Sequence, residues 1–72
     1  MAKLPFENII RRLRFDANEM TQAELGAKVG VTRQTIAAIE QGKYSPTLEA
    51  AFRIAKVFGS DIEKVFIWKD SG

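Results

Sequence analysis

The stretch from Gln22 to Gln41 limits the possible folds more than any other part of this 72-residue chain. It predicts two short helices, about 22–29 and 33–41, which are joined by only a few residues around Gly30. So short a connection makes the helices cross sharply. Gly26 permits a close approach at the crossing, and Gly30 permits the positive φ of the turn. Inward positions carry apolar residues, namely Leu25, Val29, Val31, Ile36 and Ile39.

The alternative interpretation is an ordinary helical hairpin, which does not need a glycine at both of these positions. The helix ends are marked by good capping residues. Thr21 and Thr32 are suited to accept hydrogen bonds from the first turns, and Glu24 completes a capping box with Thr21. Gly30 and Gly42 follow the two helices and favour their termination.

Three further helices are predicted around this pair. The first covers about 6–17, where Pro5 suits the helix start. The fourth covers about 48–58 after the cap Thr47, and a short fifth covers about 62–66. Spacings of three and four indicate the buried faces: Phe6, Ile9, Ile10, Leu13 and Ala17 in the first helix, and Leu48, Ala51, Phe52, Ala55 and Phe58 in the fourth. The expected fold is a compact all-α domain of five helices spanning residues 1–72.

The composition excludes several classes of function. The chain has no cysteine and no histidine, so disulfides and ordinary zinc sites are not expected. Catalysis is not expected either, because histidine and cysteine are absent and a chain of this size rarely encloses a substrate pocket of about 300 Å³. No apolar run has the roughly 20 residues of a membrane span, and the N-terminus lacks a signal-peptide core. We therefore expect a cytoplasmic protein without a cofactor, membrane association or evident small-molecule effector.

The charge distribution gives only weak support for a nucleic-acid partner. The net charge is +2. Residues 1–43 carry seven basic and five acidic side chains, whereas the remainder carries four of each. The excess therefore lies in the part that contains the crossed helices, although a generic solvated surface explains this charge equally well.

The outward face of helix 33–41 has the character of a recognition helix. It is polar at its N-terminal end and small in its middle, which lets such a helix enter the major groove of DNA. Arg33 can bond guanine, and Gln34 can bond adenine, each in a bidentate manner. The predicted base-contacting set is Thr32, Arg33, Gln34, Ala37, Ala38 and Gln41. Solvated helix surface is the alternative interpretation of these residues.

Contacts to the DNA backbone are predicted at two places. Gln22 lies at the start of the second helix, where free amides and the helix dipole favour a phosphate. Lys43 follows the recognition helix and is the candidate for a second contact, and a solvated loop lysine is the alternative interpretation. Such contacts position a protein on DNA without reading its sequence.

The segments Thr21–Leu25, Val29–Ile36 and Ile39–Pro46 resemble the Cro/C1 repressor-type (XRE-like) helix-turn-helix family, especially its small stand-alone regulators. The resemblance covers about residues 6–66. It implies a five-helix domain that binds palindromic double-stranded DNA as a homodimer. It also implies that Glu40 forms a structural ion pair with an arginine of the first helix, here Arg14. The stretch 15–19 is one residue longer than the common family spacing.

The C-terminal run from Val65 to Trp68 is apolar. One interpretation is that Phe66 and Trp68 fold back onto the small core. The other is a dimer contact within residues 65–69, either helical or through strand pairing, with Phe66, Ile67 and Trp68 as candidates. The expected function is that of a sequence-specific transcriptional regulator, specifically a repressor. An antitoxin-like or other protein-interaction module with secondary DNA binding is the alternative.

Overall fold

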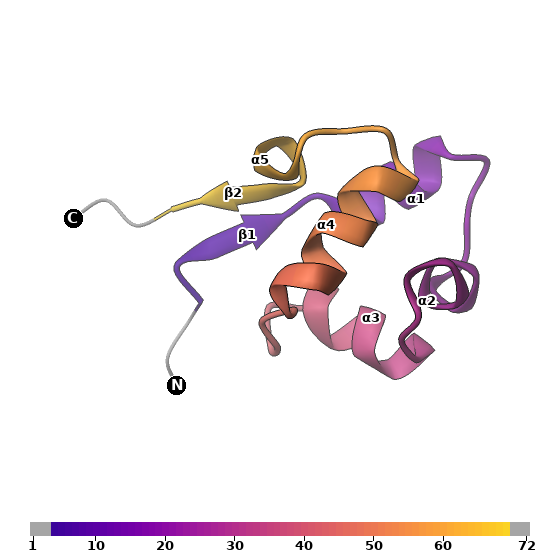
Figure 1. Ribbon diagram of the computed structural model, residues 1–72, viewed down its shortest axis with the longest axis horizontal. Helices are drawn as coiled ribbons and strands as arrows, with labels where there is room; N and C mark the ends of the chain where they lie inside the picture. Colours follow the sequence, from indigo (N-terminus) through magenta and orange to yellow (C-terminus); the bar gives the residue numbers. More distant parts are fainter. Residues whose placement is uncertain (1–3, 70–72) are drawn as a thin grey trace.

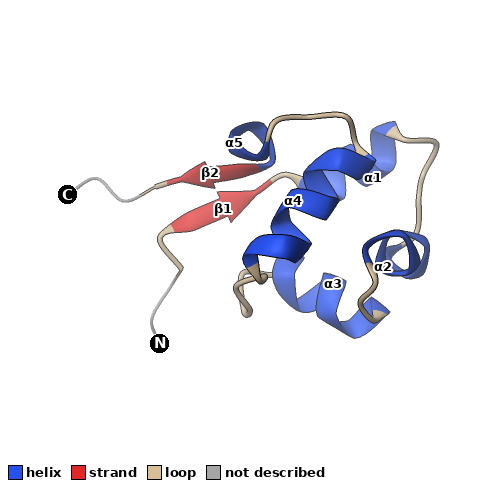
Figure 2. Ribbon diagram, viewed as in Figure 1, coloured by secondary structure: helices blue, strands red, loops and turns tan. Residues whose placement is uncertain are grey.

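The computed structural model describes residues 4–69, which form five helices and a two-stranded sheet (Figure 1). Figure 2 shows the sheet at one end and helices elsewhere. The domain is therefore mostly helical, as predicted, but it is not all-α. No helix within the described range is long and apolar enough to cross a membrane. The elements are β1 (Phe6–Asn8), α1 (Ile10–Asp16), α2 (Gln22–Val29), α3 (Arg33–Glu40), α4 (Leu48–Val57), α5 (Ile62–Val65) and β2 (Phe66–Trp68).

Threonine caps fix the starts of three helices, as the sequence predicts. The side chains of Thr21, Thr32 and Thr47 each accept a hydrogen bond from the backbone three residues later. The capping box is complete, since Glu24 Oε1 accepts from the Thr21 amide at 2.8 Å. These short-range bonds satisfy amides that have no partner within the helix.

The crossing of α2 and α3 depends on two glycines. Gly26 is buried, and a Cβ on it would lie 2.7 Å from the carbonyl oxygen of Val31. Gly30 has φ 92° and turns the chain toward α3. The core beside this turn comes from all five helices. Its fully buried large side chains are Ile10, Leu25, Ile36, Ile39, Ile54 and Val65.

The predicted N-terminal helix begins four residues late. Residues 6–8 form β1 instead, paired antiparallel with β2 so that Phe6 faces Trp68 and Asn8 faces Phe66. Asn8 then starts α1: its Oδ1 accepts from the Ile10 amide at 3.2 Å, and its Nδ2 donates to the Ile39 carbonyl at 2.9 Å. Helical spacing was the wrong interpretation here because pairing with a distant segment determines the local conformation.

The buried face of α4 also differs from the prediction. Ala51 and Ala55 are buried as expected, but Leu48 and Phe52 are 72% and 48% exposed. Ala50 and Ile54 lie in the core instead. Both sets have spacings of three or four, so the periodicity was compatible with either face, and packing against α2 and α5 selected one.

The C-terminal segment folds back onto its own chain. α5 ends at Val65 rather than Phe66, and β2 continues beside β1. Phe66 packs against the core and meets Phe6 edge-on at 6.0 Å between ring centroids. Trp68 stacks on Phe6 but stays 64% exposed. The sheet brings the two ends of the described chain together, since the Lys69 amide donates to the Pro5 carbonyl at 2.7 Å.

The long connection between α1 and α2 is accommodated by an unusual turn. Asn18 and Glu19 have φ of 61° and 56°, in the left-handed region. This conformation is uncommon for residues other than glycine, although asparagine adopts it more readily than most. The turn directs the Met20 amide back to the Arg14 carbonyl at 2.9 Å, so it closes against the end of α1.

Candidate DNA-binding surface

The outward face of α3 has the distribution of side chains that the sequence predicts. Ile36 and Ile39 are buried, whereas Arg33 and Gln34 are exposed at the first turn. Ala37 and Ala38 are half-buried farther along, and Gln41 is exposed at the C-terminal end. The helix therefore presents two long polar side chains at its start, followed by small alanine side chains, as entry into a major groove requires.

Thr32 is placed differently from the rest of the predicted base-contacting set. Its Oγ1 accepts from the Thr35 amide at 3.1 Å and lies 3.0 Å from the Thr35 hydroxyl oxygen. The hydroxyl is therefore engaged in starting α3. The residue as a whole is nevertheless exposed.

Arg14 and Glu40 form a two-point ion pair, as the family resemblance implies. The Nε of Arg14 donates to Glu40 Oε2 at 2.6 Å, and its Nη2 donates to Oε1 at 3.0 Å. The side chains are only 14% and 7% exposed. Arg14 Nη1 also donates to the Met20 carbonyl at 2.8 Å. The pair therefore fixes α1 and the following turn against the end of α3.

Gln22 joins this network from the start of α2. Its Nε2 donates to Glu40 Oε1 at 3.2 Å, which orients the side chain toward α3. The Thr21 cap satisfies the Glu24 amide, and the Leu25 amide donates to the Thr21 carbonyl. The amides of Gln22 and Ala23 make no protein hydrogen bond within the described chain. They are therefore available to an anion, which the helix dipole also favours.

The Glu24 carboxylate lies in the capping box at the start of α2. Hydrogen bonds from the backbone amide and the side chain of Thr21 lower its pKa below the usual 4.5, with a smaller contribution from Lys28. Glu24 is therefore ionised at neutral pH, in the first turn, where the helix dipole favours a negative charge.

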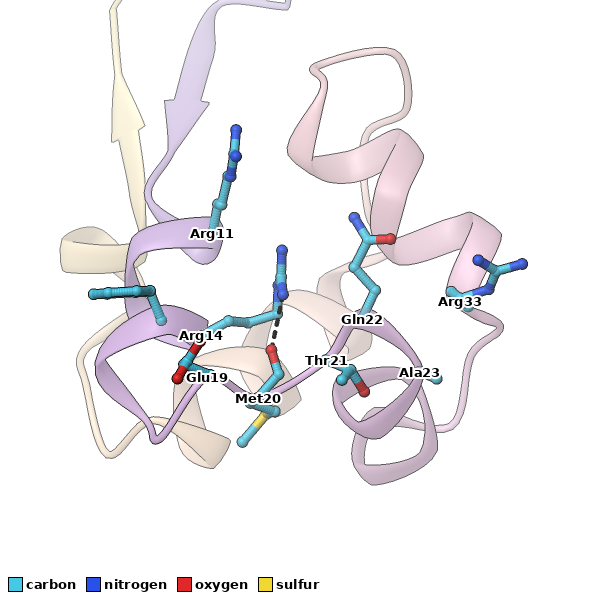
Figure 3. A pocket seen from close by; sticks show the side chains of 9 residues that line it. Arg11, Arg14, Glu19, Met20, Thr21, Gln22, Ala23 and Arg33 are labelled. Carbon is cyan, nitrogen blue, oxygen red and sulfur yellow. Dashed lines mark hydrogen bonds between the residues drawn. The ribbon is translucent and has the colours of Figure 1, made fainter.

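A cleft of about 460 Å³ lies between α1, the start of α2 and the start of α3 (Figure 3). Two of the predicted DNA-contacting residues, Gln22 and Arg33, line it together. Arg11 also lines the cleft and was not among the predicted contacts. The signal for Arg11 was present, since it precedes Arg14 by three residues and so shares its helix face.

The remaining candidates lie away from this cleft. Lys43 is exposed after α3, and its amide donates to the Ala38 carbonyl at 2.9 Å, which holds the loop against the helix end. The dimerisation candidates Phe66, Ile67 and Trp68 form β2 at the opposite end of the molecule from α2 (Figure 1). Within β2, Phe66 is engaged with the core, so Ile67 and Trp68 are the more exposed pair.

Two crossed helices, a glycine turn and an exposed polar face on the second helix define a helix-turn-helix domain. The comparison with known families agrees, because residues 10–65 match the helix-turn-helix family. The chain belongs to this family, as its resemblance to Cro/C1 repressor-type regulators predicts. Both strands of the sheet lie outside the matched residues.

Curated relatives carry names that fit this class. The chain is 57% identical over 53 residues to an uncharacterised HTH-type transcriptional regulator of Methanocaldococcus jannaschii, with 74% of this chain and 80% of the relative covered. It is 55% identical over 51 residues to another from Archaeoglobus fulgidus, covering 71% and 73%. It is also 35% identical over 60 residues to the transcriptional repressor of the cryptic phage CTXphi of Vibrio cholerae, covering 83% of this chain and 53% of that repressor.

Proposed function

We propose that this protein is a sequence-specific transcriptional repressor that inserts α3 into the major groove of double-stranded DNA. The observation that carries the proposal is the outer face of α3. There the exposed Arg33 and Gln34 lie in the first turn, and the small side chains of Ala37 and Ala38 follow them. The name of the phage relative supports repression as the direction of regulation.

The proposed contacts are of two kinds: some recognise base edges, and others bind backbone phosphates and position the protein on the duplex. Arg33 and Gln34 read base edges through bidentate hydrogen bonds, each contributing about 1–3 kcal/mol of discrimination. The free amides at the start of α2 and the Gln22 side chain bind a backbone phosphate, and Lys43 binds another beyond α3. These contacts orient the protein on the duplex and make its affinity salt-dependent.

A homodimer on an inverted repeat is the form of binding that we propose. Two recognition helices must then reach half-sites about 34 Å apart. Contact through the C-terminal strand uses Ile67 and Trp68, because Phe66 is engaged within its own chain. The sheet has two strands in the order β1-β2, so the outer edge of β2 has no neighbouring strand within the described chain. Such an edge is suited to pairing with a second copy.

Selection of bound duplexes from a random library, at about 150 mM salt, tests the DNA-binding proposal. We expect enrichment of an inverted repeat whose half-sites are about one helical turn apart. Recovery of single, unrepeated sites would contradict the dimeric form. Absence of any enriched sequence would contradict sequence-specific regulation.

The dimer contact has its own test in Trp68→Lys. We expect this variant to sediment as a monomer in analytical ultracentrifugation while keeping its helical circular dichroism, because Trp68 lies mostly outside the core. Phe52→Lys on α4 is the matched control, since it adds the same charge at an exposed aromatic residue. A Trp68→Lys protein that associates as strongly as the parent would contradict this placement of the interface.

A further inference from the structure

Three arginines lie close together on α1, and their surroundings differ. The Arg12 Nε lies 3.4 Å from the Asp16 carboxylate, one turn along the same helix. Arg14 is held by Glu40. Arg11, in contrast, makes neither an ion pair nor a side-chain hydrogen bond to any residue within 4–69. Of the three guanidinium groups, only that of Arg11 has no acidic partner within this part of the chain.

The helical periodicity determines where this charge lies. Arg11 precedes Arg14 by three residues, which places both on the face of α1 that borders the cleft. Arg12 is rotated by about 100° from Arg11 around the helix and does not line the cleft. Figure 3 shows Arg11 and Gln22 extending in the same direction from α1 and α2. The unpaired arginine thus lies on the side of the molecule that carries the start of α2.

The charges around the cleft favour an anion. Arg11, Arg14 and Arg33 line it, and Glu19 is the only acidic residue among the lining residues. Glu19 forms no ion pair with Arg11, since no such pair lies within 4.0 Å among the described residues. Glu40 neutralises Arg14 from outside the cleft. Two positive charges and one negative charge remain, beside the amides of Gln22 and Ala23.

We propose that Arg11 is a further contact to the DNA backbone, in which its guanidinium binds a phosphate oxygen beside the start of α2. This inference rests on the proposed function, because it assumes that α3 faces DNA. It makes α1 part of the DNA-binding surface, whereas the sequence prediction confined that surface to α2, α3 and the following loop. A contact of this kind strengthens binding to all sequences and reads none of them.

The experiment measures the affinity of Arg11→Ala and the parent protein for the selected duplex and for a scrambled duplex, across a salt series. Loss of one phosphate contact should reduce the slope of log affinity against log salt by about 0.9. The affinity ratio of parent to variant should therefore shrink about 3.5-fold between 50 and 200 mM salt. Both duplexes should lose affinity by the same factor. Arg11→Lys should keep the parental slope, because it keeps the charge.

The matched control is Arg12→Ala, which removes an identical side chain from the neighbouring position of the same helix. Its slope should equal that of the parent. Equal slopes for Arg11→Ala and the parent would overturn the inference, as would a change in preferred sequence. The test of Arg11 can fail independently of the test of the proposed function. A parent protein without sequence preference contradicts the regulator, yet the slopes still test Arg11, and a parent that binds no duplex contradicts both.

Discussion

At the scale of single residues, position within the α2–α3 pair separates the buried side chains, which stabilise the fold, from the exposed ones that we propose to contact DNA. Arg33 is exposed and lies at the start of α3, whereas Ile36 is completely buried one turn later. A substitution of Arg33 should therefore change DNA binding, whereas a substitution of Ile36 should change the free energy of unfolding.

Arg33→Ala should weaken binding to the selected site by about 1–3 kcal/mol and relax the preference at one base position. The physical reason is the loss of a bidentate contact to a base edge. Binding to a set of singly substituted duplexes measures this, and unfolding curves should stay near those of the parent protein. A variant that discriminates every position as well as the parent would exclude Arg33 from base recognition.

Gly26→Ala should destabilise the domain by about 1–3 kcal/mol, since overpacking forces the backbone apart. The added Cβ would lie 2.7 Å from the Val31 carbonyl oxygen, where the two helices cross. Urea denaturation measures the free energy of unfolding. Lys28→Ala, at an exposed position of the same helix, is the control and should change stability by less than about 0.5 kcal/mol. Equal stability of the two variants would show that the crossing adjusts without cost.

At the scale of helices and strands, the capping residues predicted the structure correctly, whereas the spacing of apolar residues failed where contacts with distant segments decided the outcome. The threonine caps and the capping box were predicted correctly, because each depends on bonds between residues three apart. β1 was not predicted, because its partner β2 lies about 60 residues away in the sequence. The spacing of Phe6 from Ile9 and Ile10 fits a helix, so only the strand pairing reveals the extended conformation.

In the candidate site, too, some features were predicted and others depended on how the helices pack. The face of α3 followed from helical periodicity, and the Arg14–Glu40 pair followed from the family resemblance. The bond from Gln22 to Glu40 was not predicted. It depends on the angle between α2 and α3, which the spacing of apolar residues does not specify. Arg11 was also not predicted. Its spacing from Arg14 places both residues on one face of α1, but that spacing does not specify which elements border the face.

The start of α2 should be sensitive to acid. The folded-state pKa of Glu24 is lowered relative to the unfolded value near 4.5. Its contribution to stability is therefore fully present above that value and is lost as the pH falls through the lower folded-state pKa. Unfolding experiments between about pH 7 and pH 3 should show this decline. Glu24→Gln should show a smaller decline over the same range, and an identical pH profile would contradict the role of this carboxylate.

At the scale of the whole molecule, one carboxylate connects three helices. Glu40 of α3 accepts from Arg14 of α1 and from Gln22 of α2. The pair is nearly buried, so its net contribution to stability relative to apolar residues is small, but its geometry is specific. It sets how α1 and α2 lie against α3.

Glu40→Ala should destabilise the domain by about 3–5 kcal/mol, because it leaves the Arg14 guanidinium buried without its partner. Replacing both residues, as Arg14→Met with Glu40→Leu, should restore most of that stability. Thermal unfolding of Arg14→Met, of Glu40→Leu and of the variant that combines them measures the coupling between the two side chains. Additive losses in the double variant would show that the two side chains act independently.

The pairing of β1 with β2 has a consequence for how the polypeptide can be connected. The Lys69 amide bonds the Pro5 carbonyl, so the described ends of the chain are neighbours in space. Ends that lie together at the surface tolerate circular permutation. A short peptide bridging them, with new ends opened in the exposed loop around Lys43, would change the order of the segments while keeping their arrangement. The α2–α3 unit would remain uninterrupted, so the same three-dimensional domain is accessible from a differently ordered gene.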